Sequence, residues 1–194
     1  AIDKLHIFQG DRLVILGRNG TGKSQFMGLL HRAMTGTETP GIRVSPQVVP
    51  GYVDQAMSML PDKRSLLDYI TSQFDEGDQR SKSLLAAAGF SLDKQERPIG
   101  ALSFGQRARL GLLALRLQAP NFYLLDEPTN HVDIAGQERL EAEILAHGAT
   151  CVLVSHDRSF VRGLGERFLV IERRRLVETD TPEPFFAAMA AEQG

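Results

Sequence analysis

Four short apolar runs, each followed by a polar or glycine-rich cluster, constrain the fold of this chain more than any other feature. They are LVIL at 13–16, VVPGYV at 48–53, FYLL at 122–125 and CVLV at 151–154. Because the runs are continuous rather than alternating in polarity, we expect strands that are buried on both faces of a sheet. The helices expected between them cover 23–34, 104–117 and 134–146. This alternation of strands and helices predicts a parallel α/β sheet, with ligands beyond the carboxyl ends of its strands.

The remaining segments are expected to belong to the same domain. A length of 194 residues with 42% hydrophobic residues suits one domain, 1–194, with a sizeable core. The segment at approximately 56–119 has helical periodicity in SLLDYITSQF and SKSLLAAAGF, and we interpret it as a small helical subdomain inserted in the sheet. After the fourth run, RFLVIE and RRLVET predict two short strands joined by a tight turn, and PEPFFAAMAAEQ predicts a last helix.

The octapeptide GRNGTGKS, residues 17–24, lies between the first expected strand and the first expected helix and fits the pattern G-x-x-x-x-G-K-S. Glycines allow backbone N–H groups to approach a polyphosphate closely, and the following helix adds its N-terminal amides. In this interpretation Lys23 reaches the β- and γ-phosphates, and the Ser24 hydroxyl holds Mg²⁺. The plainer alternative is a glycine-rich turn that opens an ordinary helix.

Two adjacent acids, Asp126 and Glu127, follow the run FYLL directly. Burying a carboxylate is costly unless a cation or a hydrogen-bond donor meets it. Mg²⁺ is commonly held through carboxylates and phosphate oxygens, so Asp126 is well placed to bind it through a water. Glu127 can then face the γ-phosphate and orient or deprotonate an attacking water. If the chain had no phosphate loop, the plainer interpretation would be two acidic residues at the point where a strand passes into a loop.

The stretch LSFGQ begins at Leu102 and supports two interpretations. Ser103 and Gln106 form an S-x-x-Q capping box in front of a long helix. A helix N-terminus that carries a serine and a glycine is also an anion site. From these residues alone, both interpretations stay open.

Taken together, the motifs resemble those of the ABC-type ATPases. LSFGQ is similar to the signature motif LSGGQ of that family and lies about twenty residues before YLLDEPTNHVD, GYVDQ resembles the Q-loop, and VSHDRSF resembles the switch-histidine segment. DEPTNHVD and SHDRSF are similar to the ABC-F subfamily, whose members are soluble proteins with two ABC domains, many of them acting on ribosomes. The resemblance covers nearly the whole chain and implies a P-loop NTPase fold that binds ATP and Mg²⁺.

The resemblance also implies a role for each matching position. The phosphates and magnesium would be cradled by Gly17, Asn19, Gly20, Gly22, Lys23, Ser24 and Gln25. Asp126 would bind the metal and Glu127 would be the catalytic carboxylate. Gln55 would sense Mg²⁺ and the attacking water, and His156 would contact the γ-phosphate. Taken alone, His156 would be read as a structural histidine.

The signature residues would not serve the ATP of their own domain. By the resemblance, Ser103, Gly105 and Gln106 would close over ATP held by a facing ABC domain, so that two domains sandwich two nucleotides. Asp133 would lie at the seam between them. An N-cap for the helix expected from residue 134 is an equally open reading of Asp133.

Three departures from the family pattern bear on function. Phe104 replaces the second glycine of the signature motif, and Gln25 stands where threonine is usual. The opening AIDKLHIFQGDRLVIL resembles the second strand of the family's antiparallel β subdomain, so the first strand and the aromatic residue that stacks on adenine should precede residue 1. We therefore expect a fragment of a longer polypeptide with a truncated antiparallel β subdomain, which binds ATP weakly and hydrolyses it slowly.

Composition excludes several classes of protein. A net charge of −2 does not predict a strongly basic nucleic-acid-binding face. The single cysteine, Cys151, excludes a disulfide framework within the chain, and no stretch approaches the roughly 18 apolar residues of a membrane span. We expect a soluble cytoplasmic protein without membrane insertion. The arginines at 173–175 suit an RNA patch or, alternatively, a solvated turn between two strands.

Three functions remain open from the sequence. The first is an ATP-hydrolysing ABC-F-like domain linked to translation, with a second ABC domain and the ribosome as partners; Asn130 and His131, before Asp133, favour it. The second is the ATPase subunit of a membrane transporter, whose catalytic motifs would be the same. The third is a module that binds nucleotide without hydrolysing it, which Phe104 leaves open.

Overall fold

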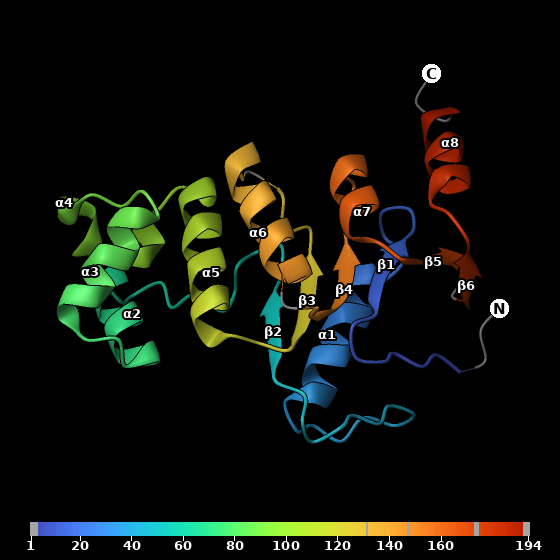
Figure 1. Ribbon diagram of the computed structural model, residues 1–194, viewed down its shortest axis with the longest axis horizontal. Coiled ribbons are helices and arrows are strands. Elements are labelled where there is room, and N and C mark those ends of the chain that lie inside the picture. The colour runs from blue at the N-terminus through green and yellow to red at the C-terminus, as the bar shows by residue number, and fades with distance from the viewer. Residues whose placement is uncertain (1–3, 131, 147, 173–174, 192–194) are drawn as a thin grey trace.

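A six-stranded, largely parallel sheet forms the centre of the computed structural model, which describes residues 4–130, 132–146, 148–172 and 175–191 (Figure 1). The strand order is β2-β3-β4-β1-β5-β6, and only the β5–β6 pair is antiparallel. The strands are β1 (Arg12–Leu16), β2 (Pro50–Val53), β3 (Phe122–Asp126), β4 (Thr150–Val154), β5 (Arg167–Glu172) and β6 (Arg175–Thr179).

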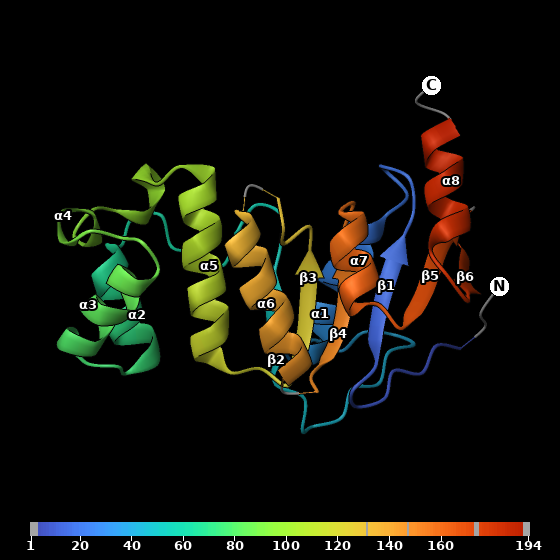
Figure 2. The ribbon, with the colours of Figure 1, turned by 45° about the horizontal axis from the view of Figure 1, so that its top comes forward.

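Helices cover both faces of this sheet. They are α1 (Lys23–Met34), α2 (Leu66–Phe74), α3 (Asp78–Ala87), α4 (Leu92–Gln95), α5 (Phe104–Gln118), α6 (Ile134–Ala146), α7 (Arg158–Leu164) and α8 (Glu183–Ala191), with a 3₁₀ turn at Ile99–Ala101. α1 lies on one face, and α6 and α7 lie on the other (Figures 1 and 2). Within the described residues, no helix has the length and apolarity that crossing a bilayer requires.

The alternation of side chains along each strand produces two hydrophobic cores. Leu13 and Ile15 of β1 belong to the core on the α1 side, whereas Val14 and Leu16 belong to the core on the side of α5, α6 and α7. All four are at most 2% exposed. A continuous apolar run is therefore what this position requires, because both faces of the central strand are covered.

The elements expected from the sequence are confirmed, with small shifts at their ends. The helices at 23–34 and 134–146 are α1 and α6, and the one at 104–117 extends to Gln118 as α5. The strand expected at 48–53 begins only at Pro50. The two last strands and the last helix are β5, β6 and α8; residues 192 and 193, which we assigned to that helix, and residues 173 and 174 lie outside the described residues.

The helices between β2 and β3 lie largely beside the sheet. α2, α3 and α4 stand at one end of the molecule, and α5 separates them from α6 (Figure 1). Tyr69 and Ile70 of α2, Leu85 of α3 and Leu110 of α5 are buried in the same core. The interpretation of 56–119 as an inserted helical subdomain remains a prediction.

The opening of the chain corrects one expectation. Residues 4–11 contain no strand, and β1 pairs in parallel with β4 and β5. The run at 13–16 is thus confirmed as a strand of the parallel sheet, whereas the antiparallel strand that the resemblance implied for this opening is not present in residues 4–16. The physical reason is the run Leu13–Leu16, which is buried on both faces and so belongs in the middle of the sheet. The antiparallel part is the β5–β6 pair at the edge.

Candidate active site

A cavity of about 480 Å³ lies where the phosphate loop meets the carboxyl ends of three strands. β3 and β4 end next to it, and the segment after β2 also reaches it. The residues that line it are Asn19, Gly20, Gly22, Lys23, Ser24, Gln25, Gln55, Asp126, Glu127, Asn130, Val154 and His156. Residues far apart in the sequence therefore share one cavity at the edge of the sheet where parallel α/β folds bind ligands.

The phosphate loop is shaped by glycines at two positions where a side chain would interfere. Gly22 is the N-cap of α1 and has φ of +99°, a left-handed conformation that residues with a Cβ rarely adopt. A Cβ on Gly17 would lie 2.7 Å from the Thr21 hydroxyl oxygen. Gly17 does not line the cavity, but it allows the loop to fold back on itself. No side chain caps the N-terminus of α1.

Lys23 lies across the loop that precedes it. Its Nζ donates hydrogen bonds to the Gly17 carbonyl oxygen at 2.7 Å and to the Arg18 carbonyl oxygen at 3.1 Å. Burial lowers the pKa of the Lys23 ammonium, while the nearby carboxylates of Glu127 and Asp126 raise it in part. The cavity therefore contains one ammonium group that faces two carboxylates.

Asp126 ends β3 and is 2% exposed. Burial raises the pKa of its carboxyl, and this effect is countered by a hydrogen bond with Ser24 and by the charge of Lys23. No group of three or more His, Cys, Asp or Glu residues suited to a metal occurs in the described part of the chain. A hydroxyl and one carboxylate, completed by water and phosphate oxygens, suit the chemistry of Mg²⁺, which seldom uses an all-protein cage. Ser24 and Asp126 therefore fit a magnesium ion.

Glu127 has both a strained backbone and an unsatisfied carboxylate oxygen. Its φ is +53°, an uncommon value for a non-glycine residue, and its N–H donates to the Val154 carbonyl oxygen at 2.8 Å. Oε2 accepts a hydrogen bond from the His156 backbone N–H at 3.3 Å. Oε1 is buried without a hydrogen-bond partner, although the His156 Nε2 lies 3.4 Å away.

This environment makes the Glu127 carboxylate a stronger base. Burial raises the pKa of the carboxyl above its ordinary value, and the neighbouring His156 lowers it in part. A buried acceptor without a donor is costly, by about 1–3 kcal/mol. A water that donates to Oε1 would remove that cost and would be held against a base, as general-base chemistry requires.

Gln55 and Asn130 line the cavity in addition to the two amide residues of the phosphate-loop region, Asn19 and Gln25. Gln55 follows β2, and the turn after it is closed by Asp54, whose Oδ1 accepts from the Ser58 N–H at 2.8 Å. Asn130 was not among the predicted site residues, although its position three residues after Glu127 was the available signal. The Asn130 N–H donates to the Glu127 carbonyl oxygen at 3.2 Å, and this turn directs Asn130 to the cavity.

Comparison with known proteins identifies the family. Residues 3–130 match the family model described as ABC transporter. The chain belongs to this family. Relatives include ABC transporter F family member 5 of Arabidopsis thaliana (33% identity, 87% of this chain and 25% of the relative), ATP-binding protein Uup of Caulobacter vibrioides (34%, 92% and 28%) and ribosome protection protein VmlR of Bacillus subtilis (30%, 85% and 30%).

The ABC domain described here thus spans between 25% and 30% of the length of these relatives. Its fold matches the ATP-binding cassette MJ0796, solved as a dimer in a post-hydrolysis state bound to ADP and Pi, with a TM-score of 0.70. The match covers 91% of this chain and 88% of that one at 22% identity. At this identity the likeness shows the fold, an ABC ATPase cassette.

The signature residues of the ABC domain lie outside the cavity, at the start of α5. The Ser103 hydroxyl accepts from the Gln106 N–H at 3.4 Å, and the Gln106 side-chain oxygen accepts from the Ser103 N–H at 3.0 Å. The capping-box interpretation is confirmed. The role of Ser103, Gly105 and Gln106 toward a facing domain stays a prediction.

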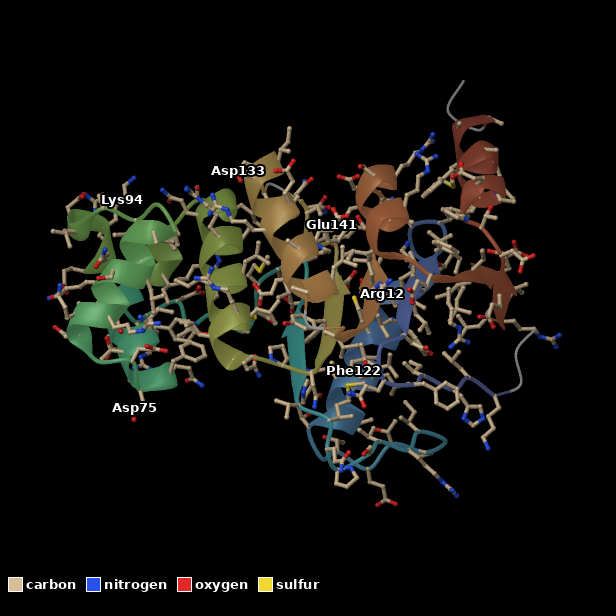
Figure 3. The ribbon with its side chains drawn as sticks, viewed as in Figure 1. Arg12, Asp75, Lys94, Phe122, Asp133 and Glu141 are labelled. Atoms are coloured by element: carbon tan, nitrogen blue, oxygen red, sulfur yellow. The ribbon has the colours of Figure 1, made fainter. Side chains whose placement is uncertain are left out.

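Asp133 also acts as a helix cap. Its Oδ1 accepts a hydrogen bond from the Gly136 N–H at 2.8 Å, which satisfies an amide in the first turn of α6. Figure 3 shows Asp133 at the start of α6, on the side of the molecule where α5 also begins. The N-cap interpretation is confirmed, while a place at a seam between domains stays a prediction. His131, two residues before Asp133, lies outside the described residues.

Proposed function

We propose that this ABC domain binds ATP with Mg²⁺ and hydrolyses it as one half of a nucleotide sandwich formed by two ABC domains. One observation carries the proposal: Lys23, Asp126 and Glu127 line the same cavity, where Glu127 Oε1 has no donor. A module that only binds nucleotide would need Lys23 and the phosphate loop, but it would not need a buried carboxylate oxygen without a hydrogen-bond donor. The membership in the ABC transporter family supports the same activity.

In this proposal, some of the residues that line the cavity bind the phosphates and the metal ion, and others act on the attacking water. The uncapped amides at the start of α1 and the Lys23 ammonium bind the β- and γ-phosphates. Ser24 and Asp126 would hold the Mg²⁺, which would neutralise charge on the phosphate oxygens when bound. Lys23 exchanges its bonds with the Gly17 and Arg18 carbonyls for bonds with phosphate oxygens.

The attacking water would be held by Glu127. Its Oε1 accepts a hydrogen bond from the water and takes the proton as the water oxygen bonds to the γ-phosphorus. The bond from the γ-phosphorus to the β–γ bridging oxygen breaks in the same displacement, and ADP leaves with that oxygen. His156, 3.4 Å from this oxygen, and Gln55, on the cavity wall, would orient the water and the γ-phosphate. Gln25 and Asn19 would contact the phosphates from the loop.

A second ABC domain is the partner that the signature residues require. The N-terminus of α5 lies outside the cavity, so Ser103, Gly105 and Gln106 do not touch nucleotide bound in their own domain. They would close over ATP in a facing domain, as either a tandem domain or a second copy. The dimer reported for the MJ0796 cassette supports this arrangement.

Translation is the cellular process that we propose for the full-length protein, with the cytoplasm as its location. Support comes from relatives that include an F family member and a ribosome protection protein. The alternative is a transporter subunit, which the family description favours. Co-sedimentation of the full-length protein with ribosomes, with and without Glu127→Gln, tests this role: ATP-dependent association strengthened by Glu127→Gln supports it, and association with neither form contradicts it.

The ATPase proposal is tested by Glu127→Gln with phosphate release and ATP affinity as the two measurements. The glutamine keeps the shape of the side chain but cannot take a proton, so hydrolysis should fall by about a hundredfold or more while ATP affinity stays within about twofold. A matched control is Glu141→Gln on α6, which should leave turnover unchanged. Normal turnover in Glu127→Gln would remove Glu127 from the role of base.

A further inference from the structure

The backbone that carries His156 is held between the catalytic carboxylate and α7. On one side, the His156 N–H donates to Glu127 Oε2 at 3.3 Å. On the other, Asp157 is the N-cap of α7, and its Oδ1 accepts from the N–H groups of Ser159 at 2.9 Å and Phe160 at 3.1 Å. His156 therefore stands one residue before a helix cap, and a movement of α7 has no flexible linker to absorb it before it reaches His156.

α7 presents two arginines to α8. Arg158 and Arg162 lie one helical turn apart, and both guanidinium groups face the ring of Phe186, with Cζ at 5.2 Å and 5.7 Å from the ring centroid. Phe186 is the buried residue of α8, at 5% exposure. Cations over an aromatic face are attracted by its quadrupole. Here the ring is buried, whereas Arg158 and Arg162 are exposed. Figures 1 and 2 show α8 at the end of the molecule, beyond α7.

Hydrogen bonds reinforce this contact. Arg162 binds the Glu183 carboxylate through two bonds, Nε to Oε1 at 2.8 Å and Nη2 to Oε2 at 2.9 Å. Arg158 Nη2 donates to the Phe186 carbonyl oxygen at 3.4 Å. Glu183 and Phe186 are three residues apart, so they share one face of α8. A bidentate pair of this kind fixes an orientation as well as a distance.

We propose that these four residues, Arg158, Arg162, Glu183 and Phe186, form a clamp that positions His156 against Glu127. The clamp holds one face of α7, while Phe160, Val161 and Leu164 hold the opposite face in the core. A helix of seven residues fixed on both faces cannot tilt, and its first turn sets the place of His156. The proposal rests on the proposed ATPase function, because His156 matters at the γ-phosphate only there.

The clamp residues are positioning residues, since none lines the cavity. If they served only to attach α8, their loss would lower stability and leave turnover per folded molecule unchanged. If they position His156, their loss lowers kcat while the KM for ATP is kept, because the loop that binds the phosphates is untouched.

The test compares Phe186→Leu, which keeps an apolar side chain but removes the ring face, with Phe186→Tyr, which keeps the ring. In the full chain, Phe186→Leu should lower kcat by roughly threefold to tenfold with KM within about twofold, and Phe186→Tyr should restore kcat. Phe74→Leu, a partly buried aromatic on α2, is the matched control and should leave kcat unchanged. Equal kcat values in wild type and Phe186→Leu would overturn the proposal.

A second measurement does not depend on turnover. The backbone amide resonance of His156, which reports its hydrogen bond to Glu127, should shift in Phe186→Leu and in Glu183→Gln but not in Arg80→Ala, which breaks an ion pair on α3. Glu183 is exposed, so Glu183→Gln gives a result even where Phe186→Leu fails to fold. An unmoved resonance in Glu183→Gln would overturn the clamp, whereas absent ATP hydrolysis in the unchanged chain would count against the proposed function alone.

Discussion

The helices α1 and α5 both begin near a glycine and a serine, but they differ in whether the chain itself satisfies the amides of the first turn. α1 begins after Gly22 without a side-chain cap, and its first residues, Lys23 and Ser24, line the cavity. α5 begins after Ser103, and a reciprocal capping box with Gln106 occupies the backbone amides of both residues. The amides of α1 are available to an anion, whereas an anion at α5 has to compete with hydrogen bonds that the chain already makes.

The difference shows that a glycine or serine near a helix start does not by itself define an anion site. What matters is whether the amides are already satisfied within the chain and whether a cation lies next to them. At α1 the Lys23 ammonium faces the carboxylates of Asp126 and Glu127, whose own burial raises their pKa values. The domain therefore supplies the amides, the ammonium and the carboxylates of the α1 site from its own chain, whereas an anion at α5 would have to come from a facing domain.

The largest expected effect tests the open N-terminus of α1. Lys23→Ala removes the ammonium that we propose binds the phosphates, and a charge-assisted interaction of about 3 kcal/mol corresponds to a loss of roughly a hundredfold in ATP affinity. Isothermal titration with Mg–ATP measures it. Lys63→Ala, at an exposed lysine before α2, is the control and should bind as wild type does. Unchanged ATP affinity in Lys23→Ala would contradict the claim that the N-terminus of α1, unlike that of α5, is the phosphate site.

The next effect concerns the pH dependence of turnover. Glu127 acts as a base only when ionised, and burial raises the pKa of its carboxyl above the ordinary value of 4.5. Activity is therefore expected to be full above the raised pKa and to fall about tenfold per pH unit below it. A profile of kcat against pH should show an acid limb with its midpoint above 4.5. A limb at or below the ordinary value would mean that the site does not desolvate Glu127.

The raised pKa of Glu127 also predicts that its ionised carboxylate lowers the stability of the folded domain at neutral pH. For an acid whose folded pKa is raised, the native state binds the proton more tightly than the unfolded chain, so stability is gained below the folded pKa and lost as pH rises through it. At neutral pH, Glu127→Gln should thus stabilise the nucleotide-free domain, by about 1 kcal/mol. Thermal unfolding at pH 7.5 measures the gain, and it should shrink at acidic pH. Destabilisation by the glutamine would contradict the assignment of an unsatisfied Oε1.

The smallest effect tests the closed N-terminus of α5. Ser103→Ala removes one half of the capping box and should lower the free energy of unfolding by about 1 kcal/mol, as loss of an N-cap does. ATP affinity of the single domain should stay unchanged, because Ser103 lies outside the cavity. Chemical denaturation and titration on the same sample provide both values. A loss of affinity at unchanged stability would place the α5 N-terminus at the nucleotide of its own domain.

Local pattern accounts for most of what the sequence predicted correctly. The strands and helices follow from apolar runs and helical periodicity, which act over a few residues, and α1 and α6 begin and end where that pattern does. The phosphate loop is likewise contained in eight consecutive residues. Asp126 and Glu127 are adjacent, and the chemistry of their pair required no knowledge of distant contacts. The role of each predicted site residue remains to be tested by experiment.

Other properties depend on contacts between distant segments, and only the tertiary structure decided them. Local periodicity predicted that residues 13–16 form a strand of the parallel sheet, but it does not encode the long-range pairing that places β1 between β4 and β5. Asn130 reaches the cavity through the turn that follows Glu127, and Glu127, with its φ of +53°, donates its N–H to the end of β4. The sequence determined which groups are present and on which elements. Burial by neighbouring strands and helices decided which of them remain unsatisfied, and that property raises the pKa of Glu127, which we propose as the base.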